Sequence, residues 1–176
     1  MAISFSNATL KLLDGKYYAV LATVNPDGSP QTSAMWIGRD GGDLLFSTVA
    51  GRVKHKNMLG DPRVSVTVLD SADPENYVEL RGRVTMTPDT GREVDTRLSW
   101  KYDGKDPGPD QPGAVRVVVR MTVEKATGYA ALRARLRRLT SVLPRVCQEI
   151  LSVLTLHVRL APTEFGVRRR GGRGPG

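Results

Sequence analysis

The chain has 176 residues, enough for one domain with a hydrophobic core, and its formal net charge is +8. One cysteine and two distant histidines exclude an internal disulfide and offer no spacing typical of metal ligands. Residues 1–15 do not resemble a secretory signal, and no run of about 20 residues lacks both charge and proline, so we expect a cytoplasmic protein without a membrane span.

The positive charge lies at the C-terminal end. Residues 1–130 contain 16 Lys and Arg against 16 Asp and Glu, whereas residues 131–176 contain 10 Arg, no Lys and 2 Glu. We therefore expect a domain at residues 1–130 and an Arg-rich tail at residues 131–176, helix-like at first and then disordered. Such a tail could bind nucleic acid or anionic lipid, but we favour a partly ordered appendage and expect no nucleic-acid partner.

The first part of the domain predicts one short helix and a meander of strands. Asn7 is a candidate N-cap for the helix. Asn25-Pro26-Asp27-Gly28 and Asp40-Gly41-Gly42 are turn signals between runs of strand-forming residues. We expect the helix at residues 5–13 and strands at residues 17–24, 31–39 and 43–48.

A strand, a turn and a basic helix follow one another at residues 43–60. Two hydroxyl residues end the strand, the small pair Ala50-Gly51 forms the turn, and three cations lie in the next segment. The start of a helix exposes unpaired N–H groups and the positive end of the helix dipole. The segment therefore suits a phosphate, although a solvated basic helix joining two strands is the simpler alternative. Asp61-Pro62 ends the helix.

The second part of the domain predicts four more strands and one longer helix. Gly82 lies in the middle of the longest predicted strand, where glycine often marks a bulge or a barrel corner. The predicted strands are residues 63–69, 77–87, 114–123 and 127–130, and the predicted helix is residues 89–101. Seven short strands separated by turn residues predict a closed antiparallel β-barrel.

The segment GDLLFSTVAGRVKHKNMLGDPRVSV, with GSPQTSAMW before it and YVELRGRV and SWKYDGKDP after it, resembles the pyridoxamine 5'-phosphate oxidase-like split-barrel flavoproteins. It is most similar to their actinobacterial branch, which uses the 8-hydroxy-5-deazaflavin cofactor, coenzyme F-420. The resemblance covers residues 5–130 and not the tail. It implies a mainly β fold, a six- to seven-stranded antiparallel split barrel of Greek-key or meander type, as in FMN-binding proteins of this kind.

The resemblance also implies a homodimer with the cofactor in a groove between the subunits. Thr48 and Lys54 would hold the cofactor phosphate, and the second predicted strand would lie along the ring system. Tyr77 would approach from the other subunit, and Arg52 and Lys56 would meet the poly-glutamate tail of a deazaflavin. The residues implied in cofactor binding are Ser33, Met35, Trp36, Ser47, Thr48, Arg52, Lys54, Lys56, Asn57 and Tyr77.

Residues 1–130 contain few side chains suited to catalysis, because they hold one histidine, His55, no cysteine and no obvious pair of carboxylates. We assign no catalytic residue and expect a cofactor to carry the chemistry. The predicted function is an oxidoreductase that binds reduced coenzyme F-420 and passes a hydride to a small organic acceptor, which the sequence does not identify. Two alternatives stay open: an FMN-dependent enzyme resembling pyridoxamine 5'-phosphate oxidase, and a cofactor-binding protein without efficient turnover.

Overall fold

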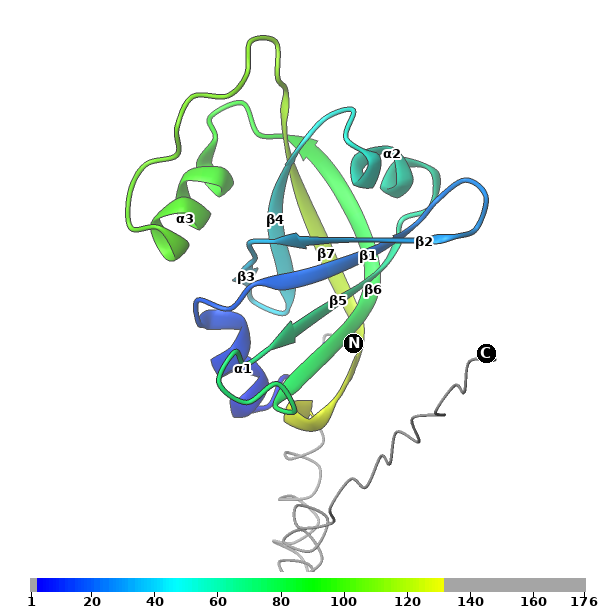
Figure 1. Cartoon of the computed structure of the whole chain (residues 1–176), viewed down its shortest axis with the longest axis vertical. Coiled ribbons are helices and arrows are strands. Elements are labelled where there is room, and N and C mark those ends of the chain that lie inside the picture. Colours follow the sequence, from blue (N-terminus) through cyan, green and yellow to red (C-terminus); the bar gives the residue numbers. More distant parts are fainter. Residues whose placement is uncertain (1–2, 132–176) are drawn as a thin grey trace, which may run out of the picture. The chain divides into compact units, whose positions relative to one another are not determined.

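The computed structural model describes residues 3–131, so the predicted Arg-rich tail lies almost wholly outside the described residues. Within this range the chain forms one sheet and three helices (Figure 1). The helices are α1 (Asn7–Asp14), α2 (Val53–Gly60) and α3 (Glu93–Tyr102). The strands are β1 (Ala19–Val24), β2 (Pro30–Met35), β3 (Gly38–Asp40), β4 (Asp43–Val49), β5 (Arg63–Leu69), β6 (Tyr77–Pro88) and β7 (Arg116–Thr127).

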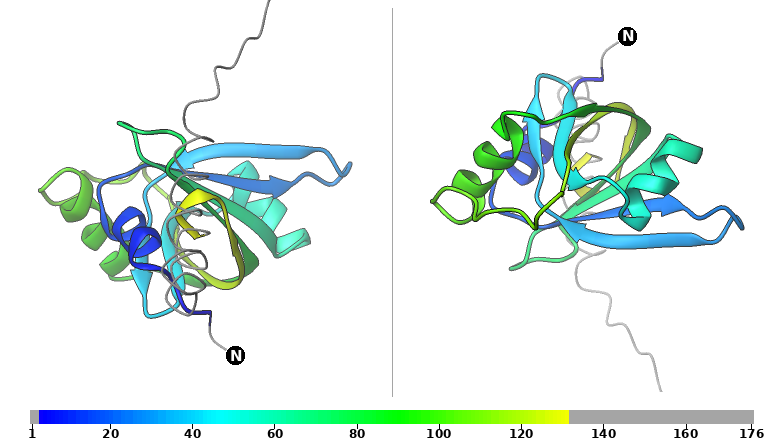
Figure 2. Two further views of the ribbon diagram at one scale, coloured as in Figure 1. Left: turned by 90° about the horizontal axis from the view of Figure 1, so that it is seen from below. Right: turned by 90° about the horizontal axis from the view of Figure 1, so that it is seen from above.

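The sheet is antiparallel throughout, with the strand order β2-β1-β5-β6-β7-β4-β3. The two longest strands, β6 and β7, pair along most of their lengths and bend, so that the sheet curls around its own core (Figures 1 and 2). Strands at opposite ends of the strand order therefore face each other across the interior. This arrangement confirms the mainly β, antiparallel barrel class that the turn signals predicted.

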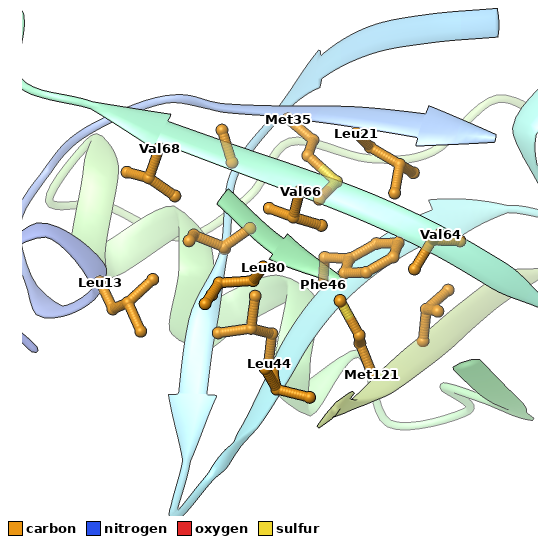
Figure 3. Close-up of a cluster of buried hydrophobic side chains, with 14 of the residues drawn as sticks. Leu13, Leu21, Met35, Leu44, Phe46, Val64, Val66, Val68, Leu80 and Met121 are labelled. Carbon is orange, nitrogen blue, oxygen red and sulfur yellow. The ribbon is translucent and has the colours of Figure 1, made fainter. Parts of the chain in front are cut away.

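Alternating apolar residues build the core of the barrel. In β5, Val64, Val66 and Val68 point inward while the residues between them face outward. Figure 3 shows Val66 lying close to Phe46 of β4, and both side chains are fully buried. Leu13 at the end of α1 is also fully buried in this cluster. The burial of these side chains is the main stabilising contribution to the fold, at roughly 1.5–3 kcal/mol for each large apolar group.

Gly82 allows the closest approach between β6 and β7. The register of the two strands shifts between Arg81 and Gly82, as the sequence predicted for a glycine inside a long strand. A Cβ atom at this position would lie 2.0 Å from the backbone oxygen of Thr122. Glycine is therefore required here by the space available.

Two predicted strands differ from the structure. The strand expected at residues 31–39 breaks into β2 and β3. The reason is that the backbone N–H and C=O of Ile37 form hydrogen bonds with side chains of α3 instead of with a neighbouring strand. The Ile37 N–H donates to the Tyr102 hydroxyl, and the Ile37 carbonyl accepts from Lys101. The strand expected at residues 127–130 is wrong, because β7 ends at Thr127, Gly128 has a φ of 93°, and residues 129–131 are helical.

The first and the last described elements meet through a helix cap. Ser6, and not the predicted Asn7, caps α1 by accepting a hydrogen bond from the N–H of Thr9. The same hydroxyl donates to the carbonyl of Ala130 at 2.8 Å. α1 is thereby tied to the residues that follow β7.

No helix among the described residues is long and apolar enough to cross a membrane.

Candidate functional site

A cleft of about 540 Å³ opens beside the start of α2 and reaches α3 and the loop that follows it. Small-molecule sites in proteins have volumes of roughly 300–1,000 Å³. The end of β2, Ser47 in β4 and Arg116 in β7 complete the lining. α2 and α3 lie on opposite sides of β4 in Figures 1 and 2, so segments far apart in the sequence contribute to one site.

Two cations at the start of α2 line the cleft, and neither forms an ion pair or a side-chain hydrogen bond with an acidic group of the described residues, although the charge of Arg52 acts on Asp110 from a distance. Gly51, at a φ of 85°, lets the chain turn sharply from β4 into the helix. Arg52 is the N-cap residue and Lys54 lies in the first turn. Burial lowers the pKa of Lys54, and the nearby charge of Arg52 lowers it further. An anion bound here would offset both effects and would also meet the positive end of the helix.

The other two arginines of the cleft are already paired. Arg116 lies 2.9 Å from a carboxylate oxygen of Asp95 and also forms a two-pronged pair with Asp110. Arg92 lies 2.6 Å from the second oxygen of Asp95 and donates to the carbonyl of Gly108. The hydrogen bond from Arg116 holds the pKa of Asp110 below its usual range. These contacts join α3, the loop after it and β7 into one wall, which leaves Arg52 and Lys54 as the cleft cations near α2 that form no direct ion pair.

An aromatic pair forms a flat part of the site. The rings of Trp36 and Tyr102 stack at 5.2 Å and 6°. The Tyr102 hydroxyl donates to the Tyr17 carbonyl at 2.8 Å and accepts from the Ile37 N–H at 3.2 Å, and burial raises its pKa. Trp36 itself lines the cleft, whereas Tyr102 lies behind it. The break between β2 and β3 thus serves to place a flat ring at the site.

Five of the ten residues implied in cofactor binding line this cleft. They are Met35, Trp36, Ser47, Arg52 and Lys54. They come from three places in the chain: the end of β2, the end of β4 and the first turn of α2. Ser47 also contacts the guanidinium of Arg116 at 3.5 Å, which links the β4 side of the cleft to β7.

The other five residues lie outside the lining of the cleft. Thr48 follows Ser47 and so faces the other side of β4, where it is 1% exposed. The buried hydroxyls of Thr48 and Ser33 have no hydrogen-bond partner within the described residues. Lys56 is exposed on α2, and Tyr77 is 39% exposed at the start of β6.

Asn57 of α2 is buried and bonded to the end of β1. Its amide nitrogen donates to the hydroxyl of Thr23 at 3.0 Å and to the side chain of Asn25 at 2.8 Å. It is 5% exposed and fastens α2 to the end of β1. In this position it supports the helix that carries Lys54.

Sequence reasoning did not identify Tyr18, Tyr102 or Arg116 as parts of the site. Tyr18 lines the cleft with a ring that is 61% exposed and lies 5.8 Å from the ring of Tyr102. Tyr102 lies in the quoted stretch SWKYDGKDP, so a signal was present. No local signal marks Arg116, because its partners are on α3 and the following loop.

The described residues contain no group of three or more His, Cys, Asp or Glu side chains that could hold a metal ion.

Comparisons with known proteins match about seven-tenths of the chain. The family model described as "Pyridoxamine 5'-phosphate oxidase" matches residues 5–129. A solved F-420 reductase is 34% identical with a TM-score of 0.64, over 69% of this chain and 98% of that protein. A conserved hypothetical protein from Mycobacterium tuberculosis is 25% identical with a TM-score of 0.57, over 71% and 84% of the two chains. HupZ from group A Streptococcus shares the fold alone, at 13% identity and a TM-score of 0.57 over 73% and 96%.

Proposed function

The chain belongs to the pyridoxamine 5'-phosphate oxidase family, and from this premise we propose that it is an oxidoreductase whose cleft binds the deazaflavin coenzyme F-420. The proposed reaction is hydride transfer from the reduced cofactor to a small organic acceptor. Similarity to an F-420 reductase supports the deazaflavin over FMN. FMN is the second candidate, because it also joins a flat ring system to a phosphate.

The observation that carries the proposal is a pair of cations that form no direct ion pair, Arg52 and Lys54, in the same cleft as the flat ring of Trp36. A phosphate at the start of α2 would place its charge against the helix dipole and both cations. A planar ring would then find an apolar, aromatic surface within the same cleft. The residues present therefore fit a cofactor that combines an anionic group with a flat ring.

The protein's part in the reaction is to bind and to orient. When bound, the cofactor would supply the hydride, and side chains of the chain need to hold it in place and exclude water. Lys54 and Arg52 would hold the anionic end, with Ser47 beside them. Trp36, fixed by its stack on Tyr102, would set the plane of the ring, and Met35 would add apolar contact.

The proposal includes a homodimer in which a second copy completes the site. Tyr18, just before β1, and Val20, in β1, are exposed, and Val20 lies opposite Ala34 of β2. Apolar side chains beside an open cleft suit a subunit contact. Tyr77 of a second copy would reach the cofactor from the other side, and the molecular mass in solution tests this part directly.

Titration of the purified chain with both cofactors tests the proposal. We expect quenching of F-420 fluorescence with a lower dissociation constant than for FMN. Lys56→Gln is expected to weaken F-420 binding and to leave FMN binding unchanged, because only F-420 carries a poly-glutamate tail for Lys56 to meet. Lys125→Gln removes an exposed cation of β7 as the matched control. Tighter binding of FMN would favour the second candidate, and binding of neither cofactor would refute both.

Turnover separates the enzyme from a cofactor-binding protein. Reduced F-420 should be oxidised by the chain in the presence of a small acceptor with a conjugated double bond, and the absorbance of the oxidised cofactor reports the reaction. Tight binding without oxidation across a panel of such acceptors would favour the binding-only alternative.

A further inference from the structure

A second, smaller pocket is lined by residues of α3, the end of α1 and β3. Its volume is about 190 Å³, against about 540 Å³ for the cleft, so it suits a smaller ligand. Leu98 lines both this pocket and the cleft, whereas the polar residues of this pocket do not line the cleft.

Four ionisable side chains line the pocket: Asp14, Arg39, Arg97 and Lys101. Arg39 is paired with Asp14, because it donates to both oxygens of that carboxylate at 3.0 and 2.8 Å; it also donates to the carbonyl of Gly41. The lining thus holds three cations against one carboxylate, and Arg97 and Lys101 form no direct ion pair, although Asp40 and Asp14 act on them electrostatically.

Lys101 has donor capacity to spare. Its ammonium donates to the carbonyls of Leu13 at 2.7 Å and Ile37 at 2.9 Å. An ammonium has three N–H groups, so one is left. Burial lowers the pKa of Lys101 to about 8, Asp14 acts in the opposite direction, and the charges of Arg97 and Arg39 lower it further. The pocket is therefore electropositive.

Arg97 makes no hydrogen bond or ion pair with any described residue. It lies one helical turn before Lys101 on α3, and like charges at this spacing repel. Gly38 has no side chain, and this leaves room for the guanidinium of Arg97. A Cβ atom at Gly38 would lie 3.3 Å from an Arg97 nitrogen and 3.2 Å from Leu98. A repelling pair of cations beside a small open volume is the arrangement that an oxyanion would stabilise.

We infer that this pocket binds a small phosphate-type oxyanion, held by the guanidinium of Arg97 and the remaining N–H of Lys101. The planar fork of Arg97 suits two oxygens of such an ion, and the ammonium of Lys101 suits a third. The ion is free phosphate or the phosphate group of a small organic molecule. The site is separate from the cleft and does not depend on the proposed function. Its occupation would stabilise the packing of α3 against α1 and β3.

Calorimetric titration of the full chain with inorganic phosphate tests the inference. The Lys54→Gln variant serves as the parent, so that phosphate binding in the cleft does not obscure the second site. We expect binding to the parent, and a loss of at least about tenfold in affinity when Arg97→Gln is added, on the scale of one charge-assisted hydrogen bond. Arg83→Gln is the control, because Arg83 is also an exposed arginine and lies on β6, away from the pocket. It should leave the affinity within about twofold, since it removes a charge outside the pocket.

Two further measurements sharpen the result. Sulfate, which keeps its charge over the relevant pH range, should bind less tightly as pH rises through about 8, because Lys101 loses its proton there. Tighter binding of glycerol phosphate than of inorganic phosphate would identify an organic phosphate as the source, and the reverse order would identify the free ion. The inference is overturned if the parent binds no phosphate at millimolar concentration, or if Arg97→Gln binds it as tightly as the parent.

Discussion

Replacing Tyr102 with Phe should loosen the aromatic side of the cleft while keeping its shape. The change removes one oxygen, which donates to the Tyr17 carbonyl at 2.8 Å and accepts from the Ile37 N–H at 3.2 Å. The ring that stacks on Trp36 stays. Any effect therefore comes from the two hydrogen bonds and not from lost packing.

The magnitude follows from those two bonds. Each contributes about 0.5–1.5 kcal/mol net, and groups left without partners cost about 1–3 kcal/mol when fully buried. Because Tyr102 is only half-buried, we expect the free energy of unfolding to fall by about 2 kcal/mol. For a chain of this length, that loss corresponds to a decrease in melting temperature of about 4–8 °C.

Urea denaturation followed by circular dichroism measures the loss, since tryptophan fluorescence would also report local changes at Trp36. Tyr18→Phe is the matched control, because the Tyr18 ring belongs to the same aromatic cluster and is 61% exposed. Its hydroxyl makes no hydrogen bond with a described residue. A loss below about 0.5 kcal/mol for Tyr102→Phe, or one equal to that of the control, would refute the claim that the hydroxyl fixes the β2–β3 break.

Three further predictions concern the support of the site and the barrel. Asn57→Ala should lower the free energy of unfolding by about 2 kcal/mol in urea denaturation, because two hydrogen bonds into the end of β1 are lost; no change would mean that they contribute nothing. Gly82→Ala should cost more than about 3 kcal/mol or prevent folding, whereas Gly60→Ala, in α2 and with no atom near its Cβ, should fold with an equal or slightly higher melting temperature, because alanine restricts the unfolded chain. Equal stabilities of the two variants would contradict the close approach of β6 and β7. Glu79 has its pKa lowered to about 2, first by the hydrogen bond from Arg81, so its stabilising contribution is complete above its unfolded pKa of 4.5 and is lost as pH falls toward about 2. The difference in unfolding free energy between the wild type and Glu79→Gln should shrink over that range, and a constant difference would show that the carboxylate is not specifically stabilised.

Local sequence signals predicted most of the barrel correctly. The turn signal after Val24, the alternating valines of β5 and the glycine inside β6 each act within a few residues, and the structure contains the expected turn, strand and bulge. The break between β2 and β3 was not predictable in this way. It depends on Lys101 and Tyr102, which are more than 60 residues away along the chain.

The candidate site shows the same division between local and distant effects. The turn that connects β4 to α2 is set by local sequence. It places Ser47, Arg52 and Lys54 in one cleft. The role of Asn57 depends on a partner in β1, 34 residues earlier, so its type and position in the sequence did not reveal it. The resemblance to a known family implied a set of residues, and the structure brings half of that set together in this cleft.

The most direct test of the central claim is the dissociation constant for coenzyme F-420, measured by fluorescence quenching in the wild type and in the double variant Arg52→Gln, Lys54→Gln. The two cations lie in the cleft and form no direct ion pair with a described residue, so an anionic cofactor should depend on them. Loss of one charged hydrogen bond, at about 1.5–3 kcal/mol, predicts binding weakened by at least about tenfold. Equal affinity of the two proteins for F-420 would contradict the claim that the start of α2 holds the cofactor.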